Sequence, residues 1–186
     1  MSSKVNVNEI IRGHYNTLKN ASTGKLSLSD WITFVILPLV VAILTVIFGF
    51  KQTNEISSLL VNFGAIFTAL LLSVLVLVYD QGIKISDKIE LKENGNNALL
   101  KRKRCLLDEL YYNICYSIVI SVSLVFFCLI ESVARGWSYS FAHGEISMNI
   151  QPDVYFLSPF IVFLTLNLMV TILMIVKRMH TLLTSN

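Results

Sequence analysis

Four long stretches of the chain are apolar: residues 31–50, 58–79, 112–134 and 154–176. Glu131 is the only Asp, Glu, Lys or Arg inside them, so it is the first candidate for chemistry. Arg135 follows four residues later, the spacing at which side chains meet on one face of a helix. One interpretation is an ion pair at the edge of the membrane. The other is a ring of acids at the mouth of an oligomeric pore.

Weakly polar residues recur in the same stretches. Asn113, Ser117 and Ser121 follow each other at steps of four, while Asn62 lies in the second stretch and Asn167 in the fourth. Polar groups in lipid are costly unless they are paired or face water. We expect these residues either to pack helices of one bundle or of neighbouring copies, or to line a hydrated pathway.

A run of four cations, Lys101-Arg102-Lys103-Arg104, is the strongest charge feature. Such a run fixes the orientation of neighbouring membrane helices and contacts anionic headgroups. A sharper interpretation is a docking patch for an acidic partner. The run has no interleaved aromatic residues, so we expect no direct contact with nucleic acid.

Signatures of catalysis are missing. The sequence has no phosphate-binding glycine loop, no HExxH, no Ser-His-Asp set at membrane depth and no CxxC. The cysteines at 105, 115 and 128 fall where a disulfide framework is not expected. We therefore expect no enzymatic activity, no cofactor and no metal site. His14, which shares the apolar face of a predicted helix near residues 7–18, is expected to be packed or interfacial.

The elements that must position these residues follow from composition. Of 186 residues 54% are hydrophobic and 15% charged, and the charges avoid the four apolar stretches. Each stretch is long enough to cross a hydrocarbon core of about 30 Å as a helix. The stretches are apolar on all sides, unlike the alternating strands of a barrel. We predict an all-α membrane protein with four transmembrane helices and exclude a soluble globular enzyme.

The basic residues predict the orientation. With both termini and the second loop cytoplasmic, thirteen of the fifteen Lys and Arg lie inside, as the positive-inside rule favours. Five segments follow from this topology: a cytoplasmic N-terminal segment with an amphipathic helix (1–30), a first transmembrane hairpin (31–79), a cytoplasmic helical hairpin (80–111), a second transmembrane hairpin with a short external loop (112–176) and a cytoplasmic tail (177–186). The cytoplasmic hairpin is predicted to turn at residues 93–97.

Two segments carry a resemblance to a family: IFTALLLSVLVLVYDQ at 66–81 and KRKRCLLDELYYNICYSIVISV at 101–122. With the four-span layout, they resemble small membrane proteins of bacterial phage-defence operons, of the type of the Kiwa membrane subunit. Retron-associated membrane effectors are the second choice. The Kiwa resemblance implies a homo-oligomer of the bacterial inner membrane, with a tetramer as one expected assembly. It also implies detection of infection-linked membrane change and a DNA-acting cytoplasmic partner from the same operon.

The sequence thus leaves a housekeeping channel and two more specific functions open. In the first, the chain is a membrane sensor and scaffold whose 80–111 hairpin recruits the cytoplasmic partner. In the second, it is a pore-forming effector that permeabilises the inner membrane when triggered, with the polar residues of its spans lining the pore.

Overall fold

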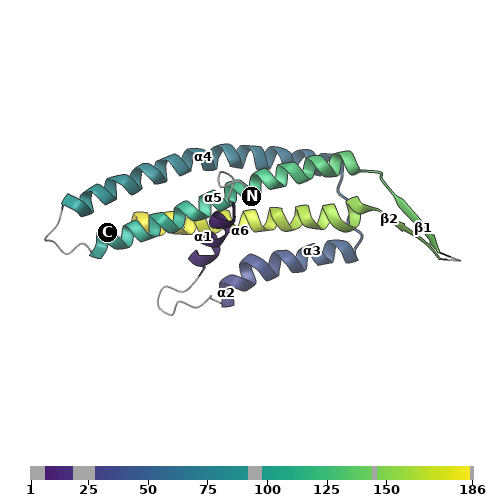
Figure 1. The fold of residues 1–186 in the computed structure, drawn as a ribbon, viewed down its shortest axis with the longest axis horizontal. Helices are drawn as coiled ribbons and strands as arrows, with labels where there is room; N and C mark the ends of the chain where they lie inside the picture. The colour runs from purple at the N-terminus through teal and green to yellow at the C-terminus, as the bar shows by residue number, and fades with distance from the viewer. Residues whose placement is uncertain (1–6, 19–27, 92–97, 144–145, 185–186) are drawn as a thin grey trace.

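The computed structural model describes residues 7–18, 28–91, 98–143 and 146–184. Its helical segments in chain order are α1 (Val7–Thr17), α2 (Leu28–Trp31), the π-helix η2 (Ile32–Ile36), α3 (Leu37–Ile47), α4 (Asn54–Leu91), α5 (Ala98–Ala134), the π-helix η3 (Asp153–Leu157) and α6 (Ser158–Thr184). Figure 1 shows α3, α4, α5 and α6 lying along one direction, while α1 crosses them. The predicted turn at 93–97 lies outside the described residues.

Among the described residues, four helices are long and apolar enough to cross a membrane, which confirms that part of the predicted fold class. They are Leu28–Ile47, Asn54–Leu91, Ala98–Ala134 and Asp153–Thr184, the first and last including the π-helical turns. α4 and α5 run for 38 and 37 residues. At 1.5 Å per residue each is about 55 Å long, nearly twice the thickness of a hydrocarbon core.

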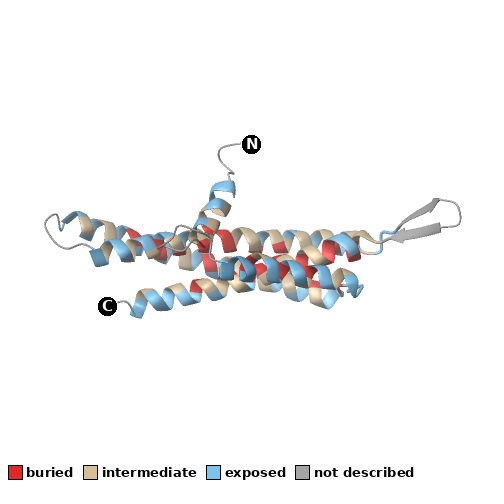
Figure 2. Ribbon diagram, turned by 90° about the horizontal axis from the view of Figure 1, so that it is seen from below, coloured by how far each residue is buried: buried red, intermediate tan, exposed pale blue. Residues whose placement is uncertain are grey.

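The core follows a heptad pattern on α5, the central helix. Its buried positions alternate steps of three and four: Leu107, Leu110, Ile114, Ser117, Ser121, Leu124, Cys128 and Glu131. α6 repeats the pattern, and α4 contributes one buried residue per seven between Ser57 and Val78. This spacing is typical of helices that pack side by side with a shallow left-handed crossing. Figure 2 shows the buried residues gathered along the inner faces of these helices.

Two π-helical turns interrupt the spanning helices, and each stands just before a proline. η2 precedes Pro38 and η3 precedes Pro159. A proline has no N–H to give to the carbonyl four residues earlier, and its ring crowds that carbonyl. A widened turn relieves the crowding and frees backbone carbonyls for other donors.

The helices continue together beyond the apolar stretches. α4 runs past residue 79 to Leu91, α5 begins at Ala98, and α6 extends to Thr184. Leu107 and Leu110 of α5 belong to one apolar cluster, against which Ile85 of α4 and Leu182 of α6 pack. The segment predicted as a tail therefore packs as a third helix beside the predicted 80–111 hairpin. We call this extension the stalk.

One segment departs from a purely helical chain. β1 (Tyr139–His143) and β2 (Ile146–Ile150) pair antiparallel in a two-stranded ribbon, with Tyr139 opposite Ile150. From its sequence this segment is expected to be an external loop. It stands at the end of the bundle opposite the stalk (Figure 1).

Candidate functional site

The short helix α1 docks on the side of the bundle. It packs against α5, and a Cβ on Gly13 would overlap the ring of Tyr112. Glycine is therefore required at position 13 for α1 to approach this closely. His14 and Leu18, both buried, are the residues that α1 and its last turn bring to the contact.

His14 is the centre of this contact and is only 1% exposed. Its Nδ1–H donates to Oδ1 of Asn113 on α5 over 2.9 Å, and its ring stacks on Tyr116 with centroids 3.9 Å apart and planes inclined by 2°. The Thr17 hydroxyl donates to the same Asn113 oxygen over 3.0 Å. A buried polar side chain must have such partners to offset its loss of water.

The contact continues through the bundle. The Tyr116 hydroxyl donates to Oδ1 of Asn167 on α6 over 2.8 Å, and Nδ2 of Asn167 donates to the backbone carbonyl of Phe34 over 2.9 Å. Pro38 is the reason this carbonyl is free, since no N–H stands four residues after Phe34. We call His14, Asn113, Tyr116 and Asn167 the α1 network; it links α1, α5, α6 and η2.

An ion pair flanks the α1 network. Arg178 of α6 lies 3.2 Å from the Glu109 carboxylate of α5 and donates to the carbonyl of Thr17 over 2.9 Å. The pKa of His14 is lowered from 6.5 to about 4, chiefly by burial; the bond to Asn113 opposes this change, and the positive charge of Arg178 contributes to it. His14 is therefore neutral at pH 7 while α1 is docked.

A second polar group lies at the end of the bundle next to the β ribbon. Arg135 Nη2 lies 2.7 Å from Glu131 Oε2, so the two residues form the ion pair that their spacing predicts. Ser57 of α4 donates to Glu131 over 2.9 Å and accepts from Arg135 over 2.8 Å. We call Ser57, Glu131 and Arg135 the ribbon-end cluster. Glu131 is 1% exposed, so this ion pair is internal to the chain.

The predicted polar stripe lies between these two groups. Ser121 and Thr68 share a hydrogen bond of 2.8 Å across α5 and α4. The hydroxyl of Ser117 and Nδ2 of Asn113 are buried and have no partner among the described residues. All of these side chains face neighbouring helices of the same chain.

Asn62 behaves differently from the other predicted polar residues. It lies on the exposed side of α4, as do Ala65, Ala69 and Ser73 on the same stripe. The structure therefore does not use this stripe to pack the four helices of one chain. Asn62 stays a predicted contact between copies or a predicted pore residue.

The four cations of the basic run differ in how exposed they are. Lys101 and Arg102 are exposed, whereas Lys103 and Arg104 are partly buried. Arg104 pairs with Asp108 over 3.2 Å. Only Lys101 and Arg102 are thus fully presented to a partner.

Tyr116, Gly13 and the Phe34 carbonyl were not expected as parts of a site. The steps of three and four on α5 place Tyr116 beside the buried face, a signal that steps of four alone miss. Among the described residues, no group of three or more His, Cys, Asp and Glu could hold a metal ion. The arrangement can hold or release α1; it presents no nucleophile with an adjacent base.

No family model matches this chain, and no curated protein or solved structure matches it either. Its class comes from its own structure. Four helices suited to crossing a membrane indicate a multi-pass membrane protein.

Proposed function

We propose that this chain is a sensor and scaffold of the bacterial inner membrane, acting in phage defence by recruiting a cytoplasmic partner to its stalk. The phage-defence part rests on the resemblance of segments 66–81 and 101–122 to membrane subunits of the Kiwa type. The sensor part rests on one observation: the α1 network connects a helix outside the spans to three spanning segments.

That observation carries the proposal because the network couples the docking of α1 to the packing of α5 against α6. Docking of α1 requires His14 to meet Asn113 and Tyr116 together. Tyr116 in turn requires Asn167 on α6. A shift of α5 against α6 in a perturbed membrane breaks this set of bonds, so the state of the spans is transmitted to α1.

Orientation follows from charge. We place both termini and the stalk in the cytoplasm, since thirteen of the fifteen Lys and Arg then lie inside. In that orientation α1 and the stalk share the inner face, and the ribbon-end cluster lies at the outer one. The exposed Lys101 and Arg102 give an acidic partner a place to bind on the stalk.

The partner is tested by charge reversal. K101E/R102E acts on two exposed side chains, and Lys88→Glu is the matched control on the α4 side of the stalk. The products of genes adjacent to the coding sequence are co-expressed with each tagged variant, and recovery is measured by quantitative mass spectrometry. We expect at least a tenfold loss for K101E/R102E only. Equal recovery from all variants contradicts a docking role of the basic run.

Assembly follows from the exposed amide. Asn62 on the outer side of α4 is costly in lipid, and we propose that a second copy covers it in a homo-oligomer such as a tetramer. Subunit number in detergent, measured by light scattering with mass spectrometry, is expected to fall for Asn62→Leu. Leu59→Ala, a change at an exposed apolar residue of α4, is the control. An unchanged assembly in Asn62→Leu removes this role.

A pore remains the second candidate function because Asn62, on the outer side of α4, could line a pathway between copies. The other predicted lining residues, Asn113, Ser117, Ser121, Glu131 and Asn167, are buried within one chain. A pathway therefore has room only between copies, along the Asn62 stripe. A potential-sensitive dye in cells expressing the protein distinguishes the functions: depolarisation that Asn62→Leu abolishes favours the pore, and a steady signal favours the scaffold.

A further inference from the structure

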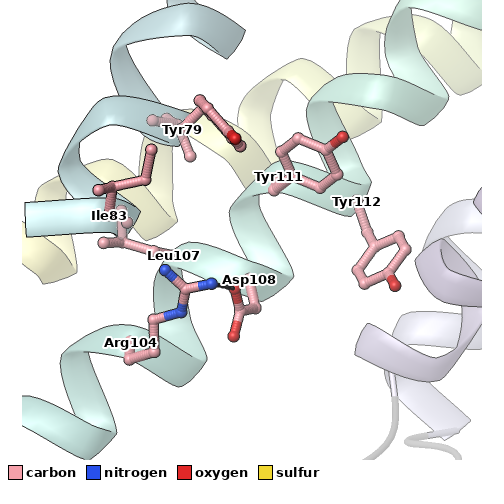
Figure 3. Close-up of a pocket in the computed structure, with 9 residues that line it drawn as sticks. Tyr79, Ile83, Arg104, Leu107, Asp108, Tyr111 and Tyr112 are labelled. Carbon is pink, nitrogen blue, oxygen red and sulfur yellow. Dashed lines mark ion pairs between the residues drawn. The ribbon is translucent and has the colours of Figure 1, made fainter. Parts of the chain in front are cut away.

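A pocket of about 360 Å³ opens between α4 and α5, and Tyr112, whose ring also contacts Gly13 of α1, forms one edge of it. It is lined by Val78, Tyr79, Gly82, Ile83, Arg104, Leu107, Asp108, Tyr111 and Tyr112. Figure 3 shows the Arg104 guanidinium and the Asp108 carboxylate side by side, with the tyrosines on one side of them. We call it the tyrosine pocket.

The position of the pocket along the helices indicates its surroundings. The apolar stretch of α4 ends at residue 79, and that of α5 begins at residue 112. The lining residues fall at 78–83 and 104–112, across both boundaries. Tyrosine is enriched at this level of membrane proteins, where the ring is apolar and the hydroxyl meets the headgroups. The tyrosine pocket thus lies where headgroups lie.

Gly82 allows the Arg104 side chain to approach the backbone of α4. A Cβ at position 82 would stand 2.7 Å from Arg104 Nη1, so the guanidinium rests against the bare backbone of α4. The other nitrogen, Nη2, lies 3.2 Å from Asp108 Oδ1. Both side chains stay partly exposed, at 37% and 53%, and are therefore open to a ligand.

The charges of the lining define the ligand. Arg104 and Asp108 are its only charged residues, so the pocket carries one positive and one negative group beside three phenols. A guanidinium and phenol hydroxyls suit a phosphate. A carboxylate beside aromatic rings suits an ammonium group. Apolar Val78, Ile83 and Leu107 suit the glycerol and the first carbons of the acyl chains.

We propose that the tyrosine pocket binds the headgroup of a zwitterionic aminophospholipid such as phosphatidylethanolamine. Arg104 and the phenols hold the phosphate, and Asp108 accepts hydrogen bonds from the ammonium. A headgroup of net negative charge gains Arg104 but meets the repulsion of Asp108. The pocket therefore differs from the exposed Lys101 and Arg102, which attract anionic lipid without regard to headgroup shape.

Native mass spectrometry of the purified protein tests the proposal. Phosphatidylethanolamine, phosphatidylglycerol and phosphatidylcholine are offered at equal concentration, and bound lipid is counted. We expect one phosphatidylethanolamine to bind at least fivefold tighter than phosphatidylglycerol. Arg104→Gln is expected to lower its binding about tenfold, and Arg102→Gln, an exposed cation of the same run, is expected to leave it unchanged.

Asp108→Asn separates recognition from folding. It removes the negative charge that attracts the ammonium and repels anions, so the preference is expected to reverse toward phosphatidylglycerol. A variant that merely folds poorly loses both lipids instead, and Tyr79→Phe with Tyr111→Phe then supplies a milder test, with an expected threefold loss of phosphatidylethanolamine.

Equal binding of the two lipids by the unaltered protein overturns the proposal. So does equal weakening by Arg102→Gln and Arg104→Gln. Lipid binding goes beyond the scaffold role and needs no partner protein. Its failure therefore leaves the recovery experiment with K101E/R102E unaffected, and failure of that experiment leaves the pocket in place.

Discussion

The ribbon end of the bundle and the region where α1 crosses it hold their polar side chains by different means (Figure 1). At the ribbon end, Glu131 and Arg135 are one helical turn apart, and their ion pair needs only Ser57 of α4 to complete it. Where α1 crosses the bundle, the α1 network has no pair of opposite charges at its centre. His14 is joined to Asn113 across 99 positions, and Asn167 to Phe34 across 133.

The two kinds of bonding differ in how they respond to movement of the helices. An ion pair on a single helix stays formed when neighbouring helices move, because both partners move together. A set of neutral bonds spread over α1, α5, α6 and η2 is lost when any one of these elements shifts. We therefore expect the ribbon-end cluster to contribute stability and the α1 network to contribute a switch.

Glu131→Leu is expected to have a larger effect on the free energy of unfolding than changes at the α1 network. It leaves Arg135, whose side chain is 19% exposed, without its anion, and breaking a buried pair costs about 3 kcal/mol. The free energy of unfolding in detergent should fall by that amount, with α1 still docked. Glu55→Leu, a change at an exposed acid of the same end, is the control. An equal loss in both variants shows that the ion pair adds nothing.

Gly13→Ala should weaken the docking of α1 and leave the ribbon-end cluster unchanged. The new methyl overlaps the Tyr112 ring, and overpacking of this kind costs about 2 kcal/mol. Hydrogen exchange of α1 amides should rise, while exchange in α5 near Glu131 stays slow. Adding Tyr112→Ala should restore protection of α1. If the double variant exchanges as fast as Gly13→Ala, the close approach is not what holds the helix.

Acid should release α1 and leave the ribbon end unaffected. Docked His14 has a pKa of about 4, and released His14 returns to its ordinary value of 6.5. The released state binds more protons between these values, so docking is strongest well above pH 6.5 and weakens as pH falls. The docking constant should fall about fivefold from pH 6.5 to 5.5, because half of the released His14 is already protonated at pH 6.5.

Spin-label distances between α1 and α5 measure this release. Arg178 and Glu109 are the charged groups that lie beside the network. His14→Gln keeps a donor for Asn113 and cannot titrate, so its distances should not change between pH 6.5 and 5.5. A pH step that persists in His14→Gln assigns the effect to another group.

The smallest expected effect belongs to Tyr116→Phe. The variant keeps the ring that stacks on His14 but loses the bond to Asn167, at about 1 kcal/mol. Docking of α1 should survive at pH 7 and release at a higher pH than in the unaltered protein. Tyr155→Phe, at an exposed position, is the matched control. No shift in the release pH shows that α6 is not coupled to α1.

Features that depend on local composition and spacing can be predicted from the sequence. Four stretches that hold a single charge between them, Glu131, are long enough to cross a bilayer and predict four spanning helices, because each stretch partitions into lipid independently. The spacing of Glu131 and Arg135 predicts their contact, because helix geometry alone brings residues four apart together. The burial of Asn113, Ser117 and Ser121 on one face has the same origin.

Only the tertiary structure decided which faces meet and which residues pair across the chain. Two stripes of α4 have comparable periodicity, yet the one through Gly64 packs on α5 and the one through Asn62 faces outward. Rotation of a helix about its axis depends on how its neighbours interlock, which no single stripe specifies. The same interlocking brings His14 onto Tyr116 and gives Asn167 a carbonyl freed by Pro38, so the candidate site exists only once the bundle is assembled.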